Sequence, residues 1–79
     1  MTYRPIACDF YDELTLRAMR RSVAEIRYVD EEGQEHVVQA VVEDVFTRGD
    51  EEYLRLESGM EIRLDRILAI DGIRQPGTC

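Results

Sequence analysis

The stretch "EHVVQAVVEDVFT", residues 35–47, decides the fold of this chain. Its many β-branched residues favour extended backbone and predict one long strand. The apolar residues alternate between two faces, with Val38, Ala40, Val42 and Phe46 on one and Val37, Val41 and Val45 on the other. A strand that is apolar on both faces over part of its length needs cover on both sides. That need indicates a strongly bent strand, as in a small barrel.

Shorter alternating segments lie on both sides of this run. They predict strands at residues 22–29, 52–58, 60–64 and 65–73, joined by turns at 30–33, 48–51 and 58–59. The alternation predicts that the side chains of eight residues face the core: Ala24, Ile26, Tyr28, Leu54, Leu56, Met60, Ile62 and Leu64. Tyr53 and Arg55 are expected on the outer face.

The N-terminal residues predict an extended arm followed by one helix. Pro5 disfavours helix in residues 1–8. Residues 9–21 have helical periodicity, with Asp9 as the expected N-cap and Asp12 reaching back to it. Acids gather in the first turn and arginines in the last, which complements the helix dipole.

The 79 residues form one domain, residues 1–79, with a barrel over 22–73 and a tail at 74–79. The expected class is mainly β with one N-terminal α-helix, arranged as a small five-to-six-stranded bent β-barrel or sandwich. Two small-barrel folds fit, the Sm-like fold and the OB-fold. The helix-first order favours the Sm-like fold, because an OB-fold usually carries its helix between the third and fourth strands.

The charge balance disfavours direct nucleic-acid binding. Seventeen acids face ten arginines, for a net charge of −7, so a large footprint on phosphates is not expected. A local patch could still stack bases on tyrosines beside arginines, which keeps a small single-stranded RNA-binding module as the alternative function. The candidate residues for such a patch are Tyr28, Tyr53, Arg48, Arg55 and Arg63. The nearby acids Glu51, Glu52, Glu57 and Glu61 weaken its positive electrostatic field.

No residue pattern predicts catalysis, a metal site or a cofactor. His36 is the one histidine and stands beside a turn, while Cys8 has no activating partner in any recognised motif. One histidine with Cys8 and Cys79 lacks structural-zinc spacing. The acid clusters at 30–32 and 50–52 fall on expected turns. We therefore expect a protein that is not an enzyme and holds no metal or cofactor.

The chain shows no secretory signal and no apolar segment near the roughly 20 residues that span a bilayer. Its two cysteines do not indicate a disulfide framework. We expect a reduced, cytoplasmic protein without a membrane partner. Its outer strands are rich in charge, which discourages edge pairing and predicts a monomer.

Residues 3–14, "YRPIACDFYDEL", resemble the start of the Rho-binding antiterminator family (Rof), whose pattern is Y-x-P-I-x-C-D-x-Y-D-x-L. The matching residues are Tyr3, Pro5, Ile6, Cys8, Asp9, Tyr11, Asp12 and Leu14. A looser likeness continues in "TRGDEEYL" and "EIRLDRI", so the resemblance covers most of the chain. It implies a bacterial Sm-like protein that binds the N-terminal RNA-binding domain of the termination factor Rho and blocks RNA loading.

The resemblance places Tyr11 and Asp12 at the interface with Rho, with Asp9 and Glu13 adding negative field. Where the family is expected to carry an acid after Leu14, this chain has Thr15, so one contact is either lost or taken over by Glu13. The central turn keeps Arg48 and Asp50 as further contacts but has Gly49 in place of a second cation. Tyr3, Pro5, Ile6 and Cys8 are expected to pin the arm and helix. The alternative is that the whole motif only caps and docks the helix.

Overall fold

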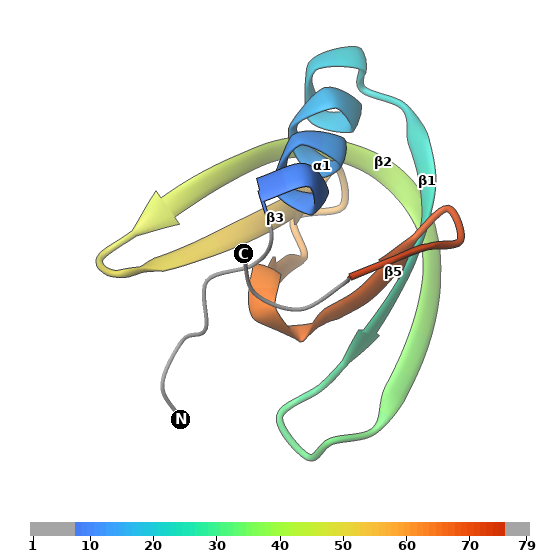
Figure 1. Ribbon diagram of the computed structural model, residues 1–79, viewed down its shortest axis with the longest axis vertical. Coiled ribbons are helices and arrows are strands. Elements are labelled where there is room, and N and C mark those ends of the chain that lie inside the picture. Colours follow the sequence, from blue (N-terminus) through green and yellow to red (C-terminus); the bar gives the residue numbers. More distant parts are fainter. Residues whose placement is uncertain (1–7, 76–79) are drawn as a thin grey trace.

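The computed structural model describes residues 8–75, which form one helix and one sheet of six antiparallel strands (Figure 1). The elements are α1 (Cys8–Arg20), β1 (Val23–Val29), β2 (Glu35–Arg48), β3 (Glu51–Leu56), β4 (Glu61–Arg63), the 3-10 turn η1 (Leu64–Arg66), β5 (Ile67–Ile70) and β6 (Ile73–Arg74). The predicted class, mainly β with one N-terminal helix, is confirmed. The roles expected for Tyr3, Pro5, Ile6 and the end of the tail fall outside the described residues.

The long strand β2 organises the sheet, whose strand order is β4-β3-β2-β1-β5-β6. Its first half pairs with β1, from Glu35 to Val41, and its second half pairs with β3, from Val42 to Arg48. Figure 1 shows β2 as a curved band that runs around the fold. The predicted bending is therefore present. Within residues 8–75 the edge strands β4 and β6 do not pair with each other, so the sheet is bent but not closed into the expected barrel.

A β-bulge in β2 changes which side chains face the core. Val42 pairs with Leu56 and Asp44 pairs with Arg55, so Glu43 is an extra residue on β2. The prediction that Phe46 shares a face with Val42 is therefore wrong. Val45 packs against the core instead, and Phe46 turns to the outer face. A single inserted residue reverses the alternation for the rest of the strand.

The core lies between the bent sheet and α1. Its buried residues are Phe10, Leu14, Ala24, Ile26, Val42, Leu54, Leu56, Ile62, Leu64, Ile67 and Ile70. The predicted inward residues of the strands are confirmed, with Tyr28 partly buried at the margin. Met60 is the exception: it follows the turn after β3, and 37% of it is exposed.

Residues 65–73 were expected to form one strand, and this prediction is wrong. They divide into the end of η1, the strand β5 and a tight hairpin to β6, in which Ile70 pairs with Ile73. The two loop residues, Asp71 and Gly72, have φ of 50° and 82°, as a type I′ turn requires. The Asp-Gly pair is the sequence signal for this hairpin. Arg74 consequently belongs to β6 and not to a tail.

Both ends of α1 differ in detail from the expected 9–21. The helix begins at Cys8, so Asp9 lies inside the first turn and is not the N-cap. At the other end the Ser22 N–H donates to the Arg17 carbonyl and the Arg21 N–H to the Ala18 carbonyl. Arg21 has φ of 51°. This pattern is a Schellman motif with arginine in the position that usually holds glycine.

Candidate partner-binding surfaces

The start of α1 forms an acidic surface together with β3. Cys8, Tyr11, Asp12 and Glu52 line a hollow of about 340 Å³. On a helix, residues three and four apart lie on the same side, which brings Tyr11 and Asp12 next to Cys8. Tyr11 packs against the core, while Asp9 and Asp12 are exposed. We call Tyr11, Asp12 and Glu52, together with the neighbouring exposed Asp9, which does not line the hollow, the helix-start surface.

Two of the other predicted interface residues make hydrogen bonds to residues of the same helix. The Glu13 carboxylate accepts a hydrogen bond from the Arg17 guanidinium at 2.8 Å. The Thr15 hydroxyl donates to the Tyr11 carbonyl at 2.9 Å. Neither residue lines the hollow. Glu52 joins the hollow instead, and the sequence did not single it out because only the folded chain brings β3 to the helix start.

The two remaining predicted residues lie at the end of the β2–β3 hairpin. Asp50 is exposed in the turn. The Arg48 guanidinium donates to both carboxylate oxygens of Glu61, at 3.0 and 3.3 Å. Arg48 pairs across the strands with Glu51, next to the outward Phe46–Tyr53 pair, whereas Glu52 belongs to the alternate face. The structure therefore does not place Arg48 on the helix-start surface.

The outer face of β2, β3 and β4 carries two stacked rings covered by arginines. The rings of Phe46 and Tyr53 lie 5.6 Å apart. The Arg48 guanidinium is 5.1 Å from the Phe46 ring and 5.3 Å from the Tyr53 ring, and the Arg55 guanidinium is 4.6 Å from Phe46. Both arginines bind Glu61. Hydrogen bonding to Arg48 lowers the pKa of Glu61, so this carboxylate stays charged and holds both cations.

Arg63 lies at the centre of a second group of hydrogen-bonded charged residues on the same face. Its guanidinium donates to Asp65 at 2.6 and 3.0 Å and to Glu51 at 3.0 Å. The Tyr53 hydroxyl donates to Glu51 at 2.7 Å, and this hydrogen bond lowers the pKa of the Glu51 carboxyl. Three arginines that could have formed a positive face for RNA are thus neutralised by carboxylates of the chain itself.

Asp71 connects the helix to the sheet by hydrogen bonds. The sequence pattern did not predict this role. Its Oδ1 accepts from the Glu25 N–H at 2.9 Å, and its Oδ2 accepts from Arg17 Nε at 2.8 Å. The Glu25 backbone hydrogen bond and then Arg17 lower the pKa of Asp71. Since Arg17 also binds Glu13, α1, β1 and the β5–β6 turn are joined at one point.

These lowered pKa values predict loss of stability in acid. Asp30, Glu51, Glu61 and Asp71 all have a pKa below the ordinary carboxyl range when folded. Their stabilising effect is complete above the unfolded pKa, about 4, and is lost as the pH falls through the lower folded values. We expect the free energy of unfolding to be flat from neutral pH to about pH 5 and to fall below it.

Urea unfolding at a series of pH values measures this dependence. Asp71→Asn should show a shallower acid slope than the native chain, because one of the four groups no longer titrates. An exposed acid whose carboxylate makes no hydrogen bond in residues 8–75, such as Asp50, provides the control, and Asp50→Asn should leave the slope unchanged. A native chain whose stability rises on acidification would contradict the prediction.

His36 lies close to an aspartate and a tyrosine beside the β1–β2 turn. The His36 Nε2 lies 2.7 Å from Asp30 Oδ2, and its ring stacks on Tyr28 at 5.3 Å between centroids. His36 thus contacts the β1–β2 turn. Among residues 8–75, no three histidine, cysteine or acidic side chains gather as metal ligands would, and no helix has the length and apolar character to cross a bilayer.

Of the predicted site residues, Asp9, Tyr11 and Asp12 thus lie on the helix-start surface, and Arg48 lies over the stacked rings of the outer face. Comparison with protein-family models gave no match for this sequence, and comparison with curated protein sequences gave none either.

Proposed function

We propose that this protein is a non-enzymatic inhibitor of Rho-dependent transcription termination. It binds the N-terminal RNA-binding region of Rho through the helix-start surface and keeps RNA from loading. The bent six-stranded sheet is, in this proposal, an open variant of the Sm-like barrel, and the protein acts as a monomer in the bacterial cytoplasm. The observation that carries the proposal is the hollow where Tyr11, Asp12 and Glu52 meet, at the residues that match the antiterminator pattern.

The chemistry of this surface suits a competitor of RNA. A site for single-stranded RNA offers cations for phosphates and flat pockets for bases. The carboxylates of Asp9, Asp12 and Glu52 can pair with such cations, and the Tyr11 ring offers an edge to such a pocket. Because Tyr11 packs against the core, it loses little conformational entropy on binding.

Several weak contacts must act together at this surface. Each exposed ion pair contributes only about 0–1 kcal/mol. The net charge of −7 also attracts the whole chain to a basic partner, which raises the association rate at low salt. Binding should therefore weaken as salt increases.

The test is a competition between this protein and a labelled pyrimidine-rich RNA on purified Rho. The native chain should displace the RNA. Asp12→Arg should weaken displacement by about tenfold or more, because it replaces an attraction to a cation by a repulsion. Glu32→Arg is the matched control: it makes the same charge change at an exposed position of the β1–β2 turn, and it should retain most of the inhibition.

Three outcomes would refute this assignment. Equal loss in Glu32→Arg and Asp12→Arg would show that net charge alone matters. RNA that remains on Rho at saturating protein would contradict the proposed blocking of RNA loading. RNA that leaves Rho because it binds this protein directly would favour the alternative, a small RNA-binding module.

One observation supports that alternative and another weakens it. The stacked Phe46 and Tyr53 rings are the kind of platform on which bases stack. However, the guanidiniums of Arg48 and Arg55 already lie over these rings and bind Glu61. A base would have to displace them, so inhibition of Rho remains the function we propose.

A further inference from the structure

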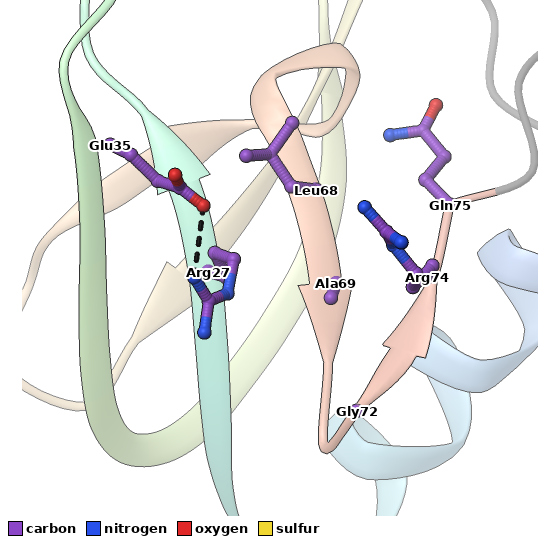
Figure 2. Close-up of a pocket in the computed structure, with 7 residues that line it drawn as sticks. All are labelled: Arg27, Glu35, Leu68, Ala69, Gly72, Arg74 and Gln75. Atoms are coloured by element: carbon purple, nitrogen blue, oxygen red, sulfur yellow. Dashed lines mark hydrogen bonds and ion pairs between the residues drawn. The ribbon is translucent and has the colours of Figure 1, made fainter.

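A groove on the outer face of β1, β5 and β6 carries two arginines and lies on different strands from the helix-start surface. Its volume is about 520 Å³, and its lining is Arg27, Glu35, Leu68, Ala69, Gly72, Arg74 and Gln75. Figure 2 shows Arg27 and Arg74 on opposite sides of Ala69. This size is within the range of pockets that hold small ligands or short peptide segments.

The strand register explains why the two arginines face each other. Arg27 pairs with Ala69 across β1 and β5, and Ala69 pairs with Arg74 across β5 and β6. The three side chains therefore form one row on one face. Arg27 and Arg74 stand two strand spacings apart, about 10 Å, which two long side chains can close. The small side chain of Ala69 leaves the space between them open.

The two guanidiniums are available to an anion. Within residues 8–75, Arg74 has no carboxylate in ion-pair distance. Arg27 donates to Glu35 at 3.0 Å, but 49% of each side chain is exposed, and such a pair contributes at most about 1 kcal/mol. An incoming carboxylate can therefore share Arg27 with Glu35. Among the described residues, Arg74 thus differs from Arg48, Arg55 and Arg63, each of which is paired with a carboxylate on the other half of the sheet.

The wall of the groove is already in place before a ligand binds. β5 carries a bulge where the register shifts between Arg27 and Tyr28, so Leu68 is an extra residue whose side chain lines the groove. Gln75 is fixed beside it: its N–H donates to the Leu68 carbonyl at 2.8 Å, and its side-chain amide donates to the Ile67 carbonyl. A preformed wall lowers the entropic cost of binding.

We propose that this groove binds an acidic peptide segment of a partner protein, with one carboxylate held between Arg27 and Arg74 and an apolar neighbour against Leu68. Charge selects this class of ligand. Two guanidiniums and Glu35 give the lining a net charge of +1, which matches one carboxylate and disfavours a dianionic phosphate. The planar fork of arginine binds a carboxylate with two hydrogen bonds.

NMR titration of the full chain, observed at the arginine Nε–H signals, tests this site. The probe is a capped peptide with a glutamate between two leucines, and its glutamine counterpart is the reference. The glutamate peptide should shift the signals of Arg27 and Arg74 and bind about tenfold or more tightly than the glutamine peptide. Arg74→Gln and Arg27→Gln should each reduce its affinity to a similar degree, whereas Arg20→Gln, at an exposed helix position, should leave it unchanged.

Each other outcome overturns the proposal. Equal binding of the two peptides, or no shift at Arg27 and Arg74, would exclude carboxylate recognition. Tighter binding of inorganic phosphate than of the glutamate peptide would make the groove a phosphate site. A shift of the Arg74 signal on dilution of the chain alone would identify a second copy as the occupant. None of these results depends on whether the chain binds Rho.

Discussion

Leu14→Ala is expected to lower the free energy of unfolding by about 2–5 kcal/mol. Leu14 is fully buried, with 0% of its surface exposed, and packs in the core with Phe10 from the same helix. Truncation removes the methine and the two methyl groups of the side chain and leaves a cavity between α1 and the sheet. Because a small domain has a total stability of about 5–15 kcal/mol, this loss is a large fraction of the whole.

Urea unfolding followed by circular dichroism measures the effect of Leu14→Ala. The matched control is Leu16→Ala on the same helix, where 36% of the residue is exposed, and we expect a loss of about 1 kcal/mol or less. Helix propensity changes equally in the two variants, so the difference reports packing. Equal losses would show that α1 is not docked as described.

The same variant bears on the candidate site. Tyr11 and Asp12 reach their positions beside Glu52 only while α1 is packed on the sheet. In the competition on Rho, Leu14→Ala should therefore lose inhibition under conditions that unfold it, whereas Asp12→Arg should lose inhibition while it remains folded. This contrast separates a residue that holds the surface in place from one that contacts the partner.

Arg63→Met is expected to cost about 3 kcal/mol. The side chains of Arg63 and Asp65 are only 9% and 6% exposed, and Arg63 also binds Glu51. Methionine keeps the length of the stem but removes the charge. The Asp65 carboxylate, at a site shielded from water, then loses its hydrogen bonds to this guanidinium, and breaking a shielded ion pair by removing one member is destabilising.

A double-mutant cycle distinguishes this loss from a loss of packing. Arg63→Met combined with Asp65→Leu should cost less than the sum of the single variants by about 1 kcal/mol or more, because neither charge is then left behind. Arg55→Met is the control on the same face: its side chain is 35% exposed, and its loss should be about 1 kcal/mol or less. Additive costs, or equal losses in Arg63→Met and Arg55→Met, would refute the role given to Arg63.

Local pattern was sufficient for the elements whose residues carry their own signals. The periodicity of Phe10 and Leu14 identified the helix, and the alternation of Ala24, Ile26, Leu54 and Leu56 identified the core faces of two strands. The turn at Asp30 was also readable, because the aspartate accepts hydrogen bonds from the N–H groups of Glu32 and Gln34 and Gly33 takes φ of 83°. In each case the physical cause lies within a few residues of its effect.

Only some residues of the candidate surfaces could be predicted from the sequence. Tyr11 and Asp12 were predicted from a motif that resembles the antiterminator pattern. Glu52, which lies with them, is about forty residues away along the chain and had no local signal. Arg48 was expected near the same interface. In the structure the Arg48 guanidinium instead donates to Glu61, 13 residues later. The β3–β4 hairpin brings this carboxylate next to Arg48 on the outer face.

The sequence alone determined the class of this protein: a helix with an acidic start, followed by short strands around one long bent strand, with a strongly negative net charge. Tertiary structure alone decided which side chains share a surface. The bulge at Glu43 turned Phe46 outward, the bulge at Leu68 placed that residue in the lining of the groove, and the register of β1, β5 and β6 set Arg27 opposite Arg74. Alternation is a property of neighbouring residues, but a bulge and a register are properties of two strands together.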